Sequence, residues 1–190
     1  MALHGLIWKD GAGNLKWAGV IVFLVLLAGC NQVPPPDELV EGHPFPRLAL
    51  TGLNTEDSSI SAFEGKLLIF NIWATWCAPC RKELPWLENL STDPGLDVTV
   101  IGMSVDSDQH VATEYLLERG ITFRNYIDLD MSIAKDLLGV RVFPDTFVIS
   151  PRGNLIRRIA GGYKWDSTKM KQALAEAAKG SYRLLKNIDG

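Results

Sequence analysis

Metal-binding side chains are scarce in this chain. Its 190 residues include only 3 cysteines and 3 histidines. A closed zinc site needs about four ligands, whereas only two of the cysteines lie near each other, and only His43 and His110 accompany them in the body of the chain. The composition therefore argues against a zinc site, and we expect no metal centre.

A positive charge excess is also absent. There are 19 Lys and Arg residues against 22 Asp and Glu residues, a formal net charge of −3, and no basic cluster stands out. We therefore expect no nucleic-acid partner. From Gly42 onward the sequence has neither internal repeats nor low-complexity tracts, and its length suits one domain with appendages.

No hydrophobic run is long enough to cross a bilayer comfortably, which takes about 20 residues. The apolar run at 17–29 instead has the length of a signal-peptide core. It closes with the sequence LAGC at 27–30, which resembles the bacterial lipobox: a hydrophobic residue and two small ones before a cysteine that becomes lipidated. We therefore predict a lipoprotein signal peptide over 1–29 and lipidation of Cys30. An ordinary cleaved signal, or an uncleaved anchor with a chance cysteine, is the alternative.

The segment after Cys30 is polar and rich in proline. Its sequence, NQVPPPDE at 31–38, is typical of an extended tether. We predict a tether over 30–41, one folded domain over 42–180 and a C-terminal tail over 181–190. In an exported protein the remaining thiols lie beyond the reducing cytosol, where a dithiol stays reduced only with a supply of electrons.

Two of the three cysteines are separated by two residues, in the sequence WCAPC at 76–80. They follow an apolar run at 67–73 that reads as a buried strand, and they begin a segment at 78–90 with helical spacing of leucines. Cys77 would lie at the helix N-terminus, which favours its thiolate, and Cys80 one turn inside. This arrangement suits an attacking thiol and a resolving thiol. A structural staple is the weaker reading, because so short a loop removes little entropy from the unfolded chain.

The remaining pattern predicts an α/β domain with a central mixed sheet flanked by helices. A turn of four residues joins the last two expected strands into a hairpin. The expected strands are 46–50, 67–73, 98–105, 123–127, 146–150 and 155–159. The expected helices are a turn at 58–63 and the segments 78–90, 109–119, 132–138 and 167–179.

Two motifs resemble those of thioredoxin-fold thiol–disulfide oxidoreductases of the TlpA, ResA and CcmG kind, which are membrane-tethered bacterial proteins. The motifs are NIWATWCAPCRKELP at 71–85, and Gly139-Val140 leading to PDTFVI at 144–149. The similarity covers about 42–179. It implies a thioredoxin-like fold with an N-terminal extension and a central insertion, here the helix at 109–119 and the strand at 123–127.

The resemblance implies roles for the residues around the cysteine pair. Cys77 is the attacking thiol and Cys80 the resolving one. Pro144 matches a cis-proline beside the active-site disulfide, where the backbone of Phe143 can bind an extended substrate segment. Without the resemblance, a plain turn proline would be the better interpretation. Trp76 is expected to present an apolar rim to a partner chain.

Two acidic residues are also candidates by resemblance. Glu83, one turn beyond Cys80, matches an acidic residue that can relay protons to the thiols. A solvated glutamate in the first turns of a helix is an equal alternative. Asn71 stands where thioredoxin has a buried aspartate, which moves the proton-relay role toward Glu83. Asp145 resembles an acidic residue typical of the CcmG branch, where it could discriminate substrates by charge, and a surface aspartate on a loop is an equally simple alternative.

The resemblance implies an extracytoplasmic reductant of disulfides in apocytochrome c or in copper-site assembly proteins. Electrons would come from a membrane thiol transporter, and no small cofactor is needed because the cysteine pair is the redox centre. We expect a monomer. A peroxiredoxin is one rival, but the Pro-x-x-x-Thr-x-x-Cys arrangement is absent before Cys77. A Sco-like copper-binding factor is another, but it needs a CxxxC pair and a late histidine, and none follows His110.

Overall fold

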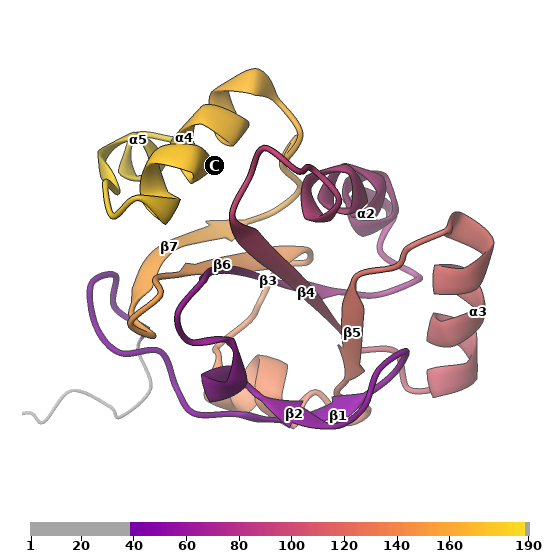
Figure 1. Ribbon diagram of the computed structural model, residues 1–190. Helices are drawn as coiled ribbons and strands as arrows, with labels where there is room; N and C mark the ends of the chain where they lie inside the picture. The colour runs from indigo at the N-terminus through magenta and orange to yellow at the C-terminus, as the bar shows by residue number, and fades with distance from the viewer. Residues whose placement is uncertain (1–38, 189–190) are drawn as a thin grey trace, which may run out of the picture. The chain divides into compact units, whose positions relative to one another are not determined.

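The computed structural model describes residues 39–188 (Figure 1). The predicted signal peptide at 1–29, the predicted lipidation site Cys30 and most of the predicted tether at 30–41 lie outside these residues. Within 39–188, no helix has both the length and the apolar character needed to cross a bilayer.

A seven-stranded mixed sheet forms the centre of the described part of the chain, in the order β2-β1-β5-β4-β3-β6-β7. Strands β3, β4 and β5 run parallel, whereas β6 pairs antiparallel with both β3 and β7, and β1 antiparallel with β5 and β2. The strands are β1 (Ala49–Gly52), β2 (Ser58–Ser59), β3 (Leu67–Trp73), β4 (Val98–Ser104), β5 (Arg124–Ile127), β6 (Asp145–Ile149) and β7 (Leu155–Ala160).

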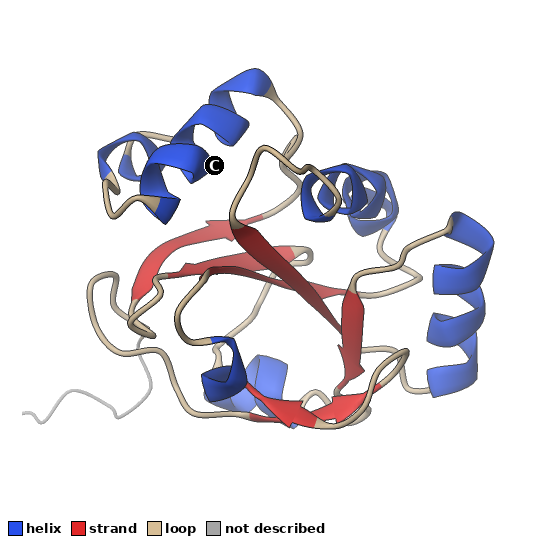
Figure 2. Ribbon diagram, viewed as in Figure 1, coloured by secondary structure: helices blue, strands red, loops and turns tan. Residues whose placement is uncertain are grey.

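Helices cover the sheet on either side (Figure 2). In that view α2 and α4 lie together on one side, and the short turns η1 and η2 lie on the other. The helical elements are η1 (Ile60–Phe63), α2 (Ala78–Ser91), α3 (Gln109–Arg119), η2 (Ser132–Leu137), α4 (Thr168–Ala178) and α5 (Arg183–Lys186).

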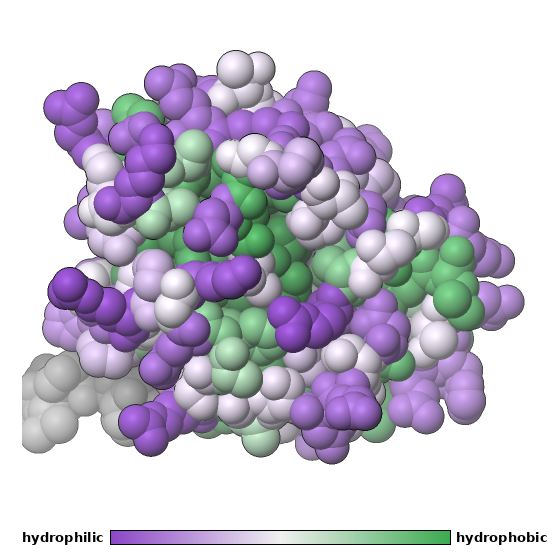
Figure 3. All heavy atoms as spheres, in the orientation of Figure 1, coloured by the Kyte–Doolittle hydropathy of each residue, from purple (hydrophilic) through white to green (hydrophobic). Residues whose placement is uncertain are grey.

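The central strand β3 leads the chain to the cysteine pair, which lies just beyond the carboxyl end of this strand. All of its residues are buried, as expected for a strand that is apolar except at Asn71 and is paired on both sides. Trp73 at its end is fully buried, and its indole Nε1 donates a hydrogen bond to Asn125 Oδ1 at 2.8 Å. Figure 3 shows polar residues over most of one face and hydrophobic residues in the hollow at its centre. The loop after β3 leads directly into α2.

Helix α2 begins at a cysteine cap. Cys77 is the N-cap residue, and its sulfur accepts a hydrogen bond from Cys80 N at 3.2 Å. Pro79 lies in the first turn, where a missing N–H leaves no bond unmade. The buried face of the helix then recurs at helical spacing, with Cys80, Glu83, Leu84, Leu87 and Leu90.

The predicted thioredoxin-like α/β fold with a mixed sheet and flanking helices is confirmed, with three local differences. The first strand lies at Ala49–Gly52 rather than 46–50, and the predicted helical turn at 58–63 begins with the two strand residues of β2. The segment predicted as a C-terminal tail contains α5, and its Leu185 and Ile188 are buried. These two apolar side chains pack onto the domain, so the folded part continues beyond residue 180.

Candidate active site

The predicted cysteine pair forms a disulfide at the N-terminus of α2. Cys77 and Cys80 are joined with their Cα atoms 5.3 Å apart. Cys77 retains 6% of its surface exposed, whereas Cys80 retains none. A thiolate at Cys77 would face the unpaired N–H groups and positive dipole end of the helix. The geometry therefore distinguishes an outer, more easily ionised cysteine from an inner one.

The loop before β6 lies at the same edge of the sheet as the disulfide, because Asp145 at the start of β6 pairs with Ile72 near the end of β3. The Phe143–Pro144 peptide bond is cis, as the family resemblance implies. Pro144 is buried and its carbonyl accepts a hydrogen bond from Gly161 N at 2.7 Å. The proline is thus held between β6 and the segment that follows β7.

Exposed apolar side chains next to the disulfide in the chain and in the loop before β6 form an apolar rim. Trp76 is 56% exposed, and its ring meets that of Phe143 edge-on with centroids 5.5 Å apart. Val142, also more than half exposed, extends this rim along the same loop. Sequence reasoning singled out Trp76 and Phe143 but missed Val142, whose only signal is its position two residues before Pro144.

Glu83 is fully buried and surrounded by hydrogen-bond donors. Its Oε1 accepts from Asn71 Nδ2 at 2.8 Å, from Trp165 Nε1 at 2.9 Å and from Thr146 Oγ1 at 3.3 Å. Its Oε2 accepts from the backbone N–H of Tyr163 at 2.9 Å. The alternative of a solvated glutamate is therefore wrong.

The surroundings of Glu83 place its titration near neutrality. Burial raises its pKa from 4.5 to about 7, although the donors from Tyr163, Trp165, Thr146 and Asn71 oppose that rise. None of those donors is charged, so none compensates the buried charge as a cation would. A carboxyl group with this pKa can hold or release a proton under ordinary conditions.

Asn71 ties Glu83 to the sheet. Its side-chain N–H₂ group donates to both Glu83 Oε1 and Thr146 Oγ1, each at 2.8 Å. Asn71 and Thr146 face each other across β3 and β6 in the strand register. Sequence reasoning noted Asn71 only as a departure from thioredoxin. It missed Thr146, Tyr163 and Trp165, whose approach to Glu83 comes from distant segments.

Asp145 is not a surface residue. Its side chain is 1% exposed and forms an ion pair with Arg158 of β7, with Arg158 Nη2 2.6 Å from Asp145 Oδ2. The same Nη2 donates to the carbonyl of Gly139 at 3.0 Å. Arg158 therefore clamps both ends of the loop that carries Phe143 and Pro144. The surface location considered for Asp145 is wrong, because β6 begins at this residue and buries it.

Asp145 differs from Glu83 in its charge environment. Burial raises the pKa of Asp145 above its usual value, while the hydrogen bonds and positive charge of Arg158 act in the opposite direction. Its buried carboxylate has a cationic partner in place.

Within residues 39–188, no group of three or more His, Cys, Asp or Glu side chains is arranged to hold a metal ion.

Known proteins that are similar to this chain are thiol–disulfide oxidoreductases or their family relatives. The model of the AhpC/TSA family matches residues 42–158. ResA, a thiol–disulfide oxidoreductase of Bacillus subtilis, is 27% identical over 144 residues, 75% of this chain and 76% of ResA. The thiol:disulfide interchange protein DsbE of Escherichia coli is 34% identical over 124 residues, 63% of this chain and 65% of DsbE.

A solved structure agrees with these relatives. The crystal structure of a putative thiol:disulfide interchange protein DsbE from Chlorobium tepidum superimposes with a TM-score of 0.66 at 25% identity, covering 74% of this chain and 99% of that one. The chain therefore belongs to the AhpC/TSA family, as a thioredoxin-like thiol–disulfide oxidoreductase related to ResA and DsbE with Cys77 and Cys80 as its redox pair.

Proposed function

We propose that this protein is an extracytoplasmic reductant of protein disulfides, held at a bacterial membrane by a lipid on Cys30. The observation that carries the proposal is the Cys77–Cys80 disulfide at the N-terminus of α2, with the buried carboxyl group of Glu83 one turn further along the same face. A nucleophile, a resolving thiol and a proton acceptor thus share one helix.

The reaction begins with the reduced pair. The Cys77 thiolate attacks one sulfur of a substrate disulfide, so that a Cys77–substrate disulfide forms and the other substrate sulfur leaves as a thiolate that takes up a proton. The Cys80 sulfur then attacks Cys77 Sγ and releases the second substrate thiolate. Two electrons pass to the substrate, and the enzyme is left in the disulfide form that the structure shows.

Glu83 supports the second step as the base for Cys80. The Cys80 thiol must lose its proton before its sulfur can attack, and a buried carboxylate with a pKa of about 7 is able to accept it. The protonated Glu83 then returns the proton when the pair is reduced again. Asn71 and Trp165 keep the carboxyl group oriented on the α2 face.

Substrate binding uses the rim and the loop before β6. Trp76, Phe143 and Val142 offer an apolar border, and the backbone around Phe143 accepts an extended segment of the substrate as an added strand. Pro144 holds that loop beside the disulfide. Asp145 contributes by fixing the loop through Arg158, because its buried carboxylate lies out of reach of a substrate.

The substrates we propose are oxidised cysteine pairs of apocytochrome c or of copper-site assembly proteins, with a membrane thiol transporter as electron donor. Similarity to ResA and DsbE supports this class of reaction. The protein would act as a monomer without a small cofactor. Labelling with a radioactive fatty acid tests the anchor: the label should appear on the chain and be lost in the Cys30→Ala variant.

The test of the activity compares Cys77→Ser and Cys80→Ser with the unaltered protein on a model protein disulfide. Cys77→Ser should abolish turnover, whereas Cys80→Ser should accumulate a mixed disulfide that survives denaturing electrophoresis and disappears on reduction. Turnover retained by Cys77→Ser would end the proposal. Equilibration of the pair with glutathione tests the direction, because a strongly oxidising potential would contradict a reductant.

A further inference from the structure

A cavity of about 510 Å³ lies far from the disulfide, between the β6–β7 turn and the C-terminal helices. Leu155 at the start of β7 contributes to its wall, as do the end of α4 and α5. Nothing in the proposed reaction uses this cavity.

Three cations from three different segments line the cavity. They are Arg152 of the turn, Lys179 at the end of α4 and Lys186 of α5, and none of the lining residues is an aspartate or glutamate. The chain as a whole carries a net charge of −3. A purely positive cavity on a negative protein concentrates anions locally.

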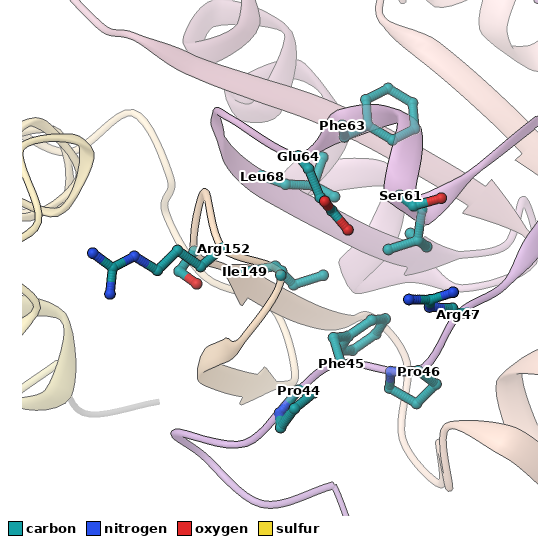
Figure 4. Close-up of a pocket in the computed structure, with 13 residues that line it drawn as sticks. Pro44, Phe45, Pro46, Arg47, Ser61, Phe63, Glu64, Leu68, Ile149 and Arg152 are labelled. Carbon is teal, nitrogen blue, oxygen red and sulfur yellow. The ribbon is translucent and has the colours of Figure 1, made fainter.

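The cations are largely available to a ligand. Among residues 39–188, Arg152 and Lys186 make no ion pair. Lys179 lies 3.5 Å from Glu176 on the outside of α4, where both side chains are well exposed and the pair is weak. Figure 4 shows the guanidinium of Arg152 extending away from a smaller neighbouring pocket near Ile149 and toward the C-terminal helices.

The rest of the lining complements an anion attached to an apolar body. Tyr182 and Asn154 supply polar side chains, and Ile156 and Ala178 supply apolar surface. We propose that this cavity binds a phosphate-bearing anion, and that its source is the headgroup of an anionic phospholipid in the membrane to which the protein is anchored.

The predicted tether joins the folded domain at the cavity, and this position favours a membrane lipid as the source of the anion. Gly42 lines the same cavity, and its N–H donates to Leu155 O at 2.7 Å. Cys30 precedes it by a stretch that can span at most roughly 40 Å when extended. If Cys30 carries a lipid, as the proposed function holds, the cavity is always within reach of the membrane surface.

The cavity and the disulfide occupy opposite ends of β7. The strand starts with Leu155 at the cavity and ends with Ala160, and Gly162 beyond it approaches Pro79 between the two cysteines. A headgroup held in the cavity would therefore orient the domain with its disulfide turned away from the bound surface and toward soluble partners.

Lysine acetylation on the full lipidated chain tests the proposal. The protein is placed in vesicles of phosphatidylcholine, in vesicles that also contain phosphatidylglycerol, and in phosphatidylcholine vesicles with added inorganic phosphate. Mass spectrometry then follows each lysine. We expect Lys179 and Lys186 to react about threefold or more slowly with phosphatidylglycerol present, because each cation near an anionic surface strengthens binding by about fivefold.

Two variants distinguish binding in the cavity from general attraction of the protein's lysines to an anionic surface. Arg152→Gln should remove most of the protection of Lys179 and Lys186, whereas Lys135→Gln, on the exposed surface of η2, should leave it intact. Disulfide reduction in solution should be the same in both variants, so failure here is distinguishable from failure of the proposed function. Protection by inorganic phosphate but not by phosphatidylglycerol would support the anion site and overturn the lipid source. Equal slowing of Lys135 and the cavity lysines, or no slowing in either arm, would overturn the site.

Discussion

Glu83 and Asp145 are both buried carboxyl groups near the redox disulfide, and their surroundings suit them to different roles. Glu83 on α2 is satisfied only by uncharged donors, whereas Asp145 on β6 is paired with the guanidinium of Arg158. Burial raises the pKa of both. The uncharged donors leave Glu83 able to gain and lose a proton, while the cation allows Asp145 to hold the loop of Pro144 as a fixed charge.

This difference shows how one fold can use acids of similar burial for chemistry and for positioning. A group that must titrate near neutrality is surrounded by dipoles, which stabilise its charge only in part. A group that must stay ionised has a fixed opposite charge beside it. Removing the Arg158 cation should therefore lower the stability of the fold, whereas removing the Glu83 acid should change how stability and activity depend on pH.

The largest effect is expected for Arg158→Met. This change leaves the buried Asp145 carboxylate without its cation, and a loss of about 3 kcal/mol in the free energy of unfolding follows at neutral pH. Urea unfolding of the disulfide form measures it. The loss should shrink as the pH falls, because an unpaired Asp145 has a still higher pKa and becomes protonated and neutral.

The chain offers a matched control for this variant. Lys171 and Asp93 also lie 2.6 Å apart, but their side chains are 35% and 23% exposed. Lys171→Met should lower stability much less than Arg158→Met, since water screens the remaining charge. The double variant Asp145→Asn with Arg158→Met should regain much of the loss. Equal losses for the two single variants would show that the Asp145–Arg158 pair behaves as a surface ion pair.

The second effect is a pH dependence that belongs to Glu83. A carboxyl group whose pKa is raised from 4.5 to about 7 stabilises the folded state below pH 4.5, and that stabilisation is lost as the pH rises through about 7. The loss over this window amounts to about 3 kcal/mol at most. Unfolding experiments across the window should show the decline in the unaltered protein and a flatter curve in Glu83→Gln.

The role of Glu83 in the reaction is tested by measuring the rate at which the mixed disulfide is resolved. If Glu83 takes the proton of Cys80, resolution of the mixed disulfide should slow by about 100-fold in Glu83→Gln, and the inflection near pH 7 should disappear. Glu114→Gln, on the exposed surface of α3, controls for loss of a negative charge. An unchanged rate and pH profile in Glu83→Gln would assign Glu83 to packing alone.

The sequence predicted the β3–α2 region and its cysteine pair better than it predicted the surroundings of the two carboxyl groups. The apolar run of β3, followed by CAPC and helical leucines, indicated the strand, the helix and the position of the disulfide because these are local patterns. Glu83 was identified as a candidate, but its burial depends on Tyr163 and Trp165, which follow β7 and are distant in sequence. No local sequence pattern predicts that Tyr163 and Trp165 contact Glu83.

The burial of Asp145 was hidden for a related reason. Its partner Arg158 lies on the other strand of the β6–β7 hairpin, so the ion pair depends on strand register as well as sequence. The folded C-terminus was also missed, since α5 is only four residues long and has too few turns for a helical pattern to repeat. Local motifs thus reveal the redox pair, while the groups that tune it emerge from pairings across the sheet.

The smallest effect, and the finest probe of Glu83, is expected for Gly162→Ala. An added Cβ would lie 3.4 Å from Pro79 Cβ and 3.7 Å from Glu83 Oε2, both ordinary contacts that require little movement. The free energy of unfolding should change by less than about 1 kcal/mol. Gly162 itself is exposed, so the methyl group places more apolar material between the buried carboxylate and the solvent. The kinetic inflection should therefore shift upward in pH, since desolvation raises the pKa of an acid. Gly95→Ala, in the loop after α2, serves as the control. A downward shift would mean that Glu83 draws its raised pKa from something other than exclusion of water.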